Sequence, residues 1–312
     1  MPEQVPARVA VPFLDEHPSS YVVRGLVAAL ERAGLRPVRL PRRIGSVLAR
    51  AGVRPPRSSR APVVVPMMGP RFDLLHTACL FGTPVPYCWD VWEPRWDDWV
   101  DVLARLRPPL VMTTALQSAE HLRDRLPGVR VEHVPEAADL QRYLPGAELA
   151  DRRIDVLELG RRNPPWHDAV APHTAELGLR HLYEPQPGQL VFPGGEREML
   201  EGLADSRISV CFPSSITHPL RSGSVATMTH RYLESIASRS LVLGSAPAEL
   251  PLLLGCDPVV PADPDDPWGQ LRSVLDSIGS YQAQVDAARE RLLAVGGWDT
   301  RAGQIAALLR AL

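Results

Sequence analysis

Short apolar runs alternate with amphipathic segments along most of the 312-residue chain. An apolar run that stops at a glycine, a proline or a polar cluster predicts a buried strand, and apolar residues recurring every three or four positions predict a helix. In the first half, the pattern predicts strands at Arg8–Leu14, Val38–Leu40, Ala61–Met67, Pro84–Asp90, Leu110–Thr113 and Val129–Val134. It predicts helices at Tyr21–Ala33, Leu74–Cys79, Pro94–Leu106 and Ser118–Arg125.

The same alternation resumes after a polar, turn-rich segment at residues 135–153. Strands are predicted at Ile154–Gly160, Arg180–Tyr183, Ile208–Phe212, Leu241–Leu243 and Pro258–Val260. Helices are predicted at His167–Leu177, Glu196–Ala204, Tyr232–Ala237, Pro247–Leu254, Trp268–Ile278, Tyr281–Ala294 and Thr300–Leu309. Strands that alternate with helices are typical of parallel sheets, and the length suggests two domains, so we expect an α/β protein with two such domains.

Composition narrows the class of protein without identifying it. Hydrophobic residues make up 45% and charged residues 22% of the chain, and the net charge is −2, so no bulk electrostatic attraction to nucleic acid or anionic membranes is indicated. The four cysteines have neither disulfide-framework nor zinc-motif spacing. No apolar stretch approaches the roughly 18 residues of a transmembrane helix, and no signal pattern opens the chain, so a cytoplasmic protein is expected.

The stretch from Ser206 to Gly244 predicts a strand, a loop, a helix and a second strand. Ligands bind at the carboxyl ends of parallel strands, so this loop and helix start form the expected ligand surface. Polar residues stand out there, namely Ser222, Ser224, Thr229, His230, Arg231 and Glu234. Unpaired N–H groups at the helix start suit a phosphorylated ligand, and Glu234 could accept hydrogen bonds from a ribose diol. The alternative is a surface helix on which Arg231 and Glu234 form an i,i+3 ion pair.

A second basic feature follows the strand that ends at Gly160. Arg161 and Arg162 come directly after this glycine, and two guanidinium groups beside a helix start could clamp a diphosphate. A solvated basic turn is the alternative. His167 is a candidate hydrogen-bond donor nearby, although a surface histidine fits the pattern better.

Aromatic and acidic residues mark the carboxyl end of the strand Pro84–Asp90. Trp89, Asp90, Trp92 and Glu93 lie where a site is expected, whereas the helical register of Trp96 and Trp99 favours core packing. The Asp263-Pro264-Asp265 motif is interpreted as helix capping, because no further ligands lie near it, and no metal site is predicted.

Several sequence blocks resemble a known family. They are LELGRRN from Leu157, SRISVCFPS from Ser206, THRYLESIASRSLVLG from Thr229, APAELPLLLG from Ala246 and WDTRAGQIAALL from Trp298. The chain is similar to two-domain glycosyltransferases of the GT-B architecture, close to the group 1 glycosyltransferases and especially their spore-maturation-like branch. The resemblance implies two Rossmann-like domains facing each other across a cleft. It implies an acceptor domain at residues 1–145, a nucleotide-sugar donor domain at 151–298 and a terminal helix at 299–312 that packs back on the first domain.

The resemblance also assigns roles to residues. Arg161 or Arg162 matches the phosphate-binding arginine, Glu234 matches the carboxylate that holds the ribose, and the loop Arg221–Ser224 matches the backbone near the sugar and phosphates. The expected donor-binding set is Arg161, Arg162, Ser222, Gly223, Ser224, Thr229, Arg231 and Glu234. The expected acceptor-binding set is Trp89, Trp92 and Glu93.

Two departures from the family pattern affect the expected mechanism. Ala226 stands where many relatives have a glutamate that contacts the donor sugar, and Trp89-Asp90 stands where many retaining members have a histidine. Asp90 could act as a general base and permit inversion, or it could only position the acceptor while configuration is retained. Retention is the family's expectation.

The expected activity is metal-independent transfer of a sugar from a nucleotide-diphosphate sugar to a hydroxyl of a small molecule or glycan, without a further cofactor. One alternative is a catalytically silent relative that binds a nucleotide or a partner protein. Another is a nucleotide-sugar epimerase. The sequence carries no motif that specifies the sugar, the base, the acceptor or the oligomeric state.

Overall fold

The chain forms two compact units in a computed structural model that describes residues 7–11, 20–41, 47, 59–186 and 188–312. The first unit contains Met1–Pro135, Leu220–Val225 and Trp298–Leu312, and the second contains Glu136–Pro219 and Ala226–Gly297. The segment 136–150, which the sequence divided between the first domain and the linker, therefore belongs to the second unit. Residues 12–14 of the first predicted strand lie outside the described residues.

The first unit is built on a parallel sheet with the strand order β2-β1-β3-β4-β5-β6. Its strands are β1 (Arg8–Val11), β2 (Arg36–Arg39), β3 (Pro62–Met68), β4 (Thr83–Trp89), β5 (Leu110–Thr113) and β6 (Arg130–His133). Its helices are α1 (Ser20–Arg32), α3 (Phe72–Ala78), α4 (Trp96–Leu106), α5 (Leu116–Arg125) and α14 (Trp298–Arg310), and the 3-10 turn η1 (Glu93–Arg95) precedes α4.

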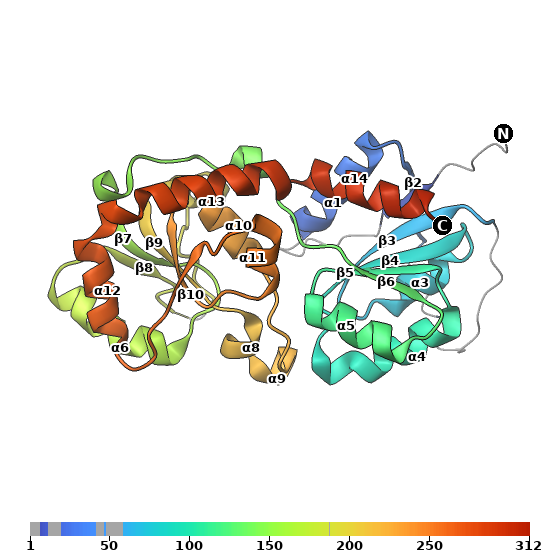
Figure 1. Ribbon diagram of the computed structural model, residues 1–312, viewed down its shortest axis with the longest axis horizontal. Helices are drawn as coiled ribbons and strands as arrows, with labels where there is room; N and C mark the ends of the chain where they lie inside the picture. The colour runs from blue at the N-terminus through green and yellow to red at the C-terminus, as the bar shows by residue number, and fades with distance from the viewer. Residues whose placement is uncertain (1–6, 12–19, 42–46, 48–58, 187) are drawn as a thin grey trace. The chain divides into compact units, whose positions relative to one another are not determined.

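Helices cover both faces of this sheet because its strands are apolar on both sides. On one face, Val63 and Val65 of β3 pack against α3, α4 and α5. Trp99 of α4 is fully buried in this cluster. On the other face, the ring of Trp89 meets that of Trp298 on α14 edge to face, with centroids 6.4 Å apart. α14 lies beside α1 (Figure 1).

The second unit is built on a parallel sheet with the order β11-β10-β9-β7-β8. Its strands are β7 (Ile154–Glu158), β8 (His181–Tyr183), β9 (Ser206–Cys211), β10 (Leu241–Gly244) and β11 (Val259–Pro261). Its helices are α6 (Pro164–Glu176), α7 (Glu196–Ala204), α8 (Ser214–Thr217), α10 (His230–Ala237), α11 (Glu249–Leu254), α12 (Pro267–Asp276) and α13 (Gln282–Val295). Its 3-10 turns are η2 (Leu140–Arg142), η3 (Leu149–Asp151) and η4 (Ile278–Tyr281). A further short helix, α9 (Pro219–Ser222), lies where the chain passes into the first unit.

Alternate residues of the second sheet also face two helical layers. Val156 of β7 points toward α6 and α12, where it packs with Trp166 and Leu271. Leu157, the next residue along β7, points to the opposite face and packs with Tyr232 of α10 in a cluster that α7, α11 and α13 complete. Figure 1 shows α6 and α12 along one side of this sheet and α10, α11 and α13 along the other. The predicted α/β class with parallel sheets is thus confirmed.

Two parts of the chain return to the first unit after the second has begun. The loop Leu220–Val225 and the last segment, Trp298–Leu312, cluster with the first unit. Val225 is buried there against Trp92 and Ala115. Among the described residues, no helix has both the length and the apolar character that membrane crossing requires.

Candidate functional site

A basic turn and a helix start meet at the carboxyl edge of the second sheet. After β7 ends at Glu158, the chain turns at Gly160 with a φ of +97°, a conformation that favours glycine. A Cβ atom at Gly160 would lie 4.0 Å from Nη2 of Arg231, so the first turn of α10 reaches this turn. Thr229 begins α10 without a side-chain capping hydrogen bond, and no acidic residue occupies the first turn. This edge therefore concentrates positive charge and N–H donors.

Glu234 provides the carboxylate at this helix. Its side chain is buried, and its Oε1 accepts a hydrogen bond of 3.0 Å from the hydroxyl of Tyr143. Its Oε2 forms an ion pair with Nη1 of Arg231. The i,i+3 pair is thus present, but on a buried face of the helix and not on the surface that the alternative interpretation assumed. A carboxylate offers about four lone-pair sites, so Glu234 retains acceptor capacity. Tyr143 was not predicted from the sequence.

The two arginines after Gly160 have different surroundings. Arg162 donates to the carbonyl oxygen of Glu184, has its Nη1 3.4 Å from Nε2 of His167, and lies over the ring of Tyr183 at 5.0 Å from the centroid. Arg161 is exposed, and its charge acts on Tyr232 of α10. Burial raises the pKa of Tyr232 on that helix, and the charge of Arg161 opposes the shift. Of the two arginines, Arg161 is the one whose charge acts on α10.

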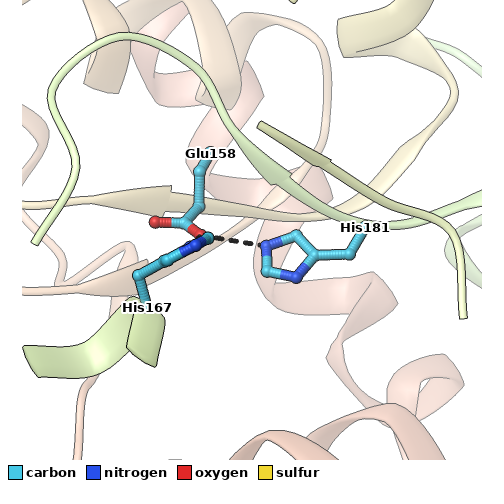
Figure 2. A group of neighbouring side chains, drawn as sticks. All are labelled: Glu158, His167 and His181. Atoms are coloured by element: carbon cyan, nitrogen blue, oxygen red, sulfur yellow. Dashed lines mark hydrogen bonds and ion pairs between the residues drawn. The ribbon is translucent and has the colours of Figure 1, made fainter. Parts of the chain in front are cut away.

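His167 is part of a buried cluster. Its Nδ1 lies 2.5 Å from Oε1 of Glu158, and Nε2 of His181 lies 2.9 Å from the same oxygen (Figure 2). His167 is 8% exposed, which corrects its interpretation as a surface histidine. The sequence did not indicate Glu158 or His181, because each sits inside an apolar strand pattern and only the pairing of β7 with β8 brings them together.

His230, the first residue of α10, pairs with a residue from the start of the second unit. Its Nε2 lies 3.0 Å from Oε1 of Glu136. Burial disfavours the charged imidazolium, but the charges of Glu136 and Glu234 outweigh this cost and raise the pKa of His230. When His230 is protonated, its charge adds to the positive charge at the helix start.

A separate polar group follows β4 in the first unit. Asp90 has a φ of +56°, a left-handed conformation that aspartate tolerates better than most residues, and its Oδ2 lies 3.5 Å from Nη2 of Arg221. Glu93 accepts a hydrogen bond of 2.6 Å from the backbone N–H of Ser224. This bond holds the pKa of Glu93 below its ordinary value. Gly223 lies so close that a Cβ there would be 2.3 Å from Oε2 of Glu93.

The tryptophans at this end of β4 are buried. Trp89 is 3% and Trp92 is 6% exposed, so their rings complete the core of the first unit and offer an acceptor little surface. Trp89 packs edge to face with Tyr87, with centroids 4.5 Å apart. Trp99 is core, as its register predicted, whereas Trp96 is only partly buried and stacks on His121.

The predicted donor-binding residues fall into two groups. Arg161, Arg162, Thr229, Arg231 and Glu234 belong to the second unit, whereas Ser222, Gly223 and Ser224 belong to the first, beside the predicted acceptor residue Glu93.

The chain re-enters the second unit at Ala226. The residues just after this point contact Glu249, a buried glutamate that was not predicted from the sequence. Oε1 of Glu249 accepts hydrogen bonds from Oγ1 of Thr227, at 2.7 Å, and from the N–H of Met228. Its position in the apolar run APAELPLLLG was the available signal. Asp266, the residue after the motif interpreted as capping, caps α12 by accepting from the N–H of Gly269. Within the motif, Asp263 instead accepts from the N–H groups of Asp265 and Asp266.

Comparison with known proteins identifies the fold. No family model matches the chain, and no curated protein sequence matches it significantly. Sucrose-phosphate synthase from Thermosynechococcus elongatus is similar in structure, with a TM-score of 0.63 and 15% identity over 98% of both chains. AviGT4, a glycosyltransferase involved in avilamycin A biosynthesis, gives a TM-score of 0.59 and 15% identity over 98% of this chain and 97% of that one.

A third solved structure was determined with bound ligands. A variant of TarM from S. aureus, solved with fondaparinux, α-GlcNAc-glycerol and UDP, gives a TM-score of 0.55 and 8% identity over 85% of this chain and 58% of that one. At these identities the likeness concerns the fold. The chain has the α/β fold with two Rossmann-like domains that GT-B glycosyltransferases share.

Proposed function

We propose that this protein is a glycosyltransferase that moves a sugar from a nucleotide-diphosphate sugar to a hydroxyl acceptor. The observation that carries the proposal is the convergence of the Gly160 turn, Arg231 and Glu234 at the carboxyl edge of the second sheet. In open α/β sheets this edge is where ligands bind. The similarity in fold to the glycosyltransferase AviGT4, and to the TarM variant solved with UDP, supports the same assignment.

The donor would bind by its charge and by its ribose. Arg161, Arg231 and the N–H groups at the start of α10, which no side chain caps, suit the diphosphate. Glu234 is oriented by Tyr143 and retains lone pairs for a ribose diol. Arg162 fits a supporting role instead, because the carbonyl of Glu184 and the ring of Tyr183 already hold its guanidinium group.

The transfer step would depend mainly on electrostatic stabilisation. As the bond between the sugar and the diphosphate breaks, negative charge develops on the leaving nucleoside diphosphate. Two arginines and helix-start N–H groups stabilise this charge without a divalent ion, so we propose a metal-independent reaction. Asp90 is the proposed residue for the acceptor hydroxyl, and its left-handed backbone is the kind of strained geometry found at functional sites. Retention of configuration is the proposed outcome, with Asp90 positioning the acceptor.

Calorimetric titration with UDP, GDP, TDP and ADP, with and without magnesium, tests the donor site. We expect one base to bind best and magnesium to change its affinity little. Arg161→Ala and Arg231→Ala should each weaken binding about tenfold or more, the loss of a charge-assisted hydrogen bond of about 1.5–3 kcal/mol. Arg197→Ala, which removes a highly exposed arginine of α7 in the same unit, is the matched control and should bind normally. If none of the four nucleotides binds, the donor site is refuted.

Hydrolysis of the matching nucleotide-sugar, measured with and without acceptor, tests the reaction itself. Asp90→Asn should keep the nucleotide affinity of the unaltered protein and reduce turnover. A protein that binds the nucleotide but turns over no sugar on any acceptor would instead fit a catalytically silent nucleotide-binding relative.

A further inference from the structure

Three buried side chains from three neighbouring elements meet beside the carboxyl end of β7. Glu158 is the last residue of β7, His167 lies on the first turns of α6, and His181 opens β8. Nδ1 of His167 and Nε2 of His181 lie 2.5 and 2.9 Å from Oε1 of Glu158, and the three atoms lie within 4.8 Å of one another (Figure 2). Two imidazole nitrogens and a carboxylate oxygen therefore converge on one point.

The contacts around His181 are compatible with a cation at that point. Oγ1 of Thr174 lies 2.9 Å from the carbonyl oxygen of Ala171 and 3.0 Å from Nδ1 of His181. When the hydroxyl donates its one hydrogen to Ala171, Nδ1 of His181 donates to the hydroxyl and carries the hydrogen of the ring. Nε2 of a neutral His181 then presents a lone pair to Oε1 of Glu158. Two acceptors facing each other at 2.9 Å are stable only with a proton or a metal ion between them.

Glu158 carries a second sign that the cluster is incomplete. The residue is 4% exposed, and its Oε2 is buried without a hydrogen-bond partner among the described residues. A buried carboxylate is costly unless its charge is balanced and its lone pairs are used. The ionic partners of Glu158 within the described part of the chain are the two imidazoles, and each approaches the other oxygen, Oε1.

We propose that Glu158, His167 and His181 bind one divalent transition-metal ion, with Zn²⁺ as the best match. Zn²⁺ prefers imidazole nitrogen and carboxylate oxygen at about 2.0–2.2 Å, and two histidines with one glutamate are a recurrent ligand set for it. Ligand atoms around a tetrahedral ion of this size lie about 3.4 Å apart, which follows from those bond lengths. The nitrogens of His167 and His181 need to retreat from Oε1 by less than about 1 Å, and Oε2 or a water can take the fourth position.

The outer partners of His181 also suit a metal site. With its Nε2 on the ion, His181 donates from Nδ1 to Thr174, which in turn donates to Ala171, and such an outer chain fixes the tautomer of a ligating histidine. His167 would bind through Nδ1 and carry its hydrogen on Nε2, the atom that now faces Arg162. Arg162 would then keep its bond to the carbonyl of Glu184 and lose His167 as an acceptor.

The proposed ion is separate from the transfer reaction. It lies within the second unit, against α6 and β8, and its ligands are none of the residues proposed to hold the diphosphate. Its binding is therefore measured without nucleotide, and a failure here leaves the proposed function untouched.

Titration of the full-length, chelator-treated protein with Co²⁺, followed by competition with Zn²⁺, tests the proposal. We expect one Co²⁺ per chain, visible absorption bands typical of four or five ligands, and displacement by one equivalent of Zn²⁺. Glu158→Gln and His181→Gln should each lower the affinity at least about 100-fold, and Thr174→Val about 10- to 100-fold, the range for an outer partner. His173→Gln is the control, because His173 lies on the same helix but is half exposed and outside the cluster.

The possible outcomes distinguish a metal ion bound between His181 and Glu158 from a proton at the same position. Absence of 1:1 binding overturns the proposal, and so does 1:1 binding that Glu158→Gln, His181→Gln and Thr174→Val leave unchanged. Nitrogen NMR that shows His181 doubly protonated, in protein to which Co²⁺ does not bind, would assign the position to a proton. If Glu158→Gln fails to fold, the isosteric Thr174→Val variant and His167→Gln still decide the question.

Discussion

The carboxylate of Glu93 accepts a hydrogen bond of 2.6 Å from the backbone N–H of Ser224, a residue 131 positions later in the chain. Gly223, immediately before, has a φ of +61° and packs so closely on Glu93 that a side chain has no room. Nη2 of Arg221 lies 3.5 Å from the carboxylate of Asp90 in the same region. The end of β4 thus holds the loop Leu220–Val225 by polar contacts at both ends of the loop.

We predict that this loop loosens at low pH. The hydrogen bond to Ser224 lowers the pKa of Glu93, so the bond is fully present above the ordinary pKa of a glutamate and is lost as the pH falls through the lowered value. Hydrogen exchange of the Ser224 amide, measured from neutral to acidic pH and corrected for intrinsic rates, should show this loss of protection.

Variants at two glutamates check the same contact. Glu93→Ala should remove the protection of Ser224 already at neutral pH, because no carboxylate remains to accept the bond. Glu120→Ala, at an exposed glutamate of α5 in the same unit, should leave the protection unchanged. Equal protection in both variants would show that the loop is held by other contacts.

Gly25→Ala should destabilise the protein by about 1–3 kcal/mol, the usual cost of overpacking a core. The added Cβ would lie 2.6 Å from Nε1 and 2.8 Å from Cδ1 of Trp298, so α1 and α14 would have to separate. Gly303→Ala, within α14 where a Cβ meets nothing within 4 Å, should instead stabilise by about 0.5–1 kcal/mol. Urea unfolding of both variants measures the two opposite signs, and destabilisation of similar size in both would contradict the packing explanation.

Tyr143→Phe should cost about 1.5–3 kcal/mol of stability, because the lost hydroxyl donates to the buried carboxylate of Glu234. If Glu234 holds a ribose, the same change should also weaken nucleotide binding, since it frees the carboxylate to reorient. Thermal unfolding and calorimetry measure the two effects. Tyr281→Phe is the control, because the hydroxyl of Tyr281 makes no hydrogen bond to the described residues.

The pair of His230 and Glu136 should make stability depend on pH above the ordinary histidine range. The pKa of His230 is raised in the folded protein despite its burial, because Glu136 and Glu234 outweigh both that burial and the charge of Arg231. This contribution is fully present below the unfolded pKa of about 6.5 and is lost as the pH rises through the raised folded value. Unfolding free energies should therefore fall across that window.

His230→Gln should flatten this pH dependence, since glutamine does not titrate. His173→Gln, at an exposed histidine of the same unit, should keep the slope of the unaltered protein. A slope that survives in His230→Gln would assign the pH dependence to another group.

The elements of the fold were predictable because they depend on local periodicity. Leu110–Thr113 and Glu196–Ala204 form elements with the predicted bounds, and most others differ by one to three residues at their ends. The short helices α8 and α9 were missed, because four residues are too few to show a helical period.

The candidate site was predictable only where its residues share one segment. Arg231 and Glu234 are three positions apart, so their pairing could be foreseen, whereas the pairing of Glu158 with His181 depends on which strands become neighbours. His167 shows the same limit. Its burial comes from the contact of α6 with the sheet. The sequence around His167 gives no sign of this contact.

The first unit contains segments from distant parts of the chain, and this determines when the unit can finish folding during synthesis. Trp89 packs against Trp298, and Trp92 packs against Val225, so the core of this unit uses residues made long after its sheet. A nascent chain that has emerged only to Pro135 has both indole rings without these partners. The first unit is therefore completed after the second, and its final packing must wait until α14 has left the ribosome.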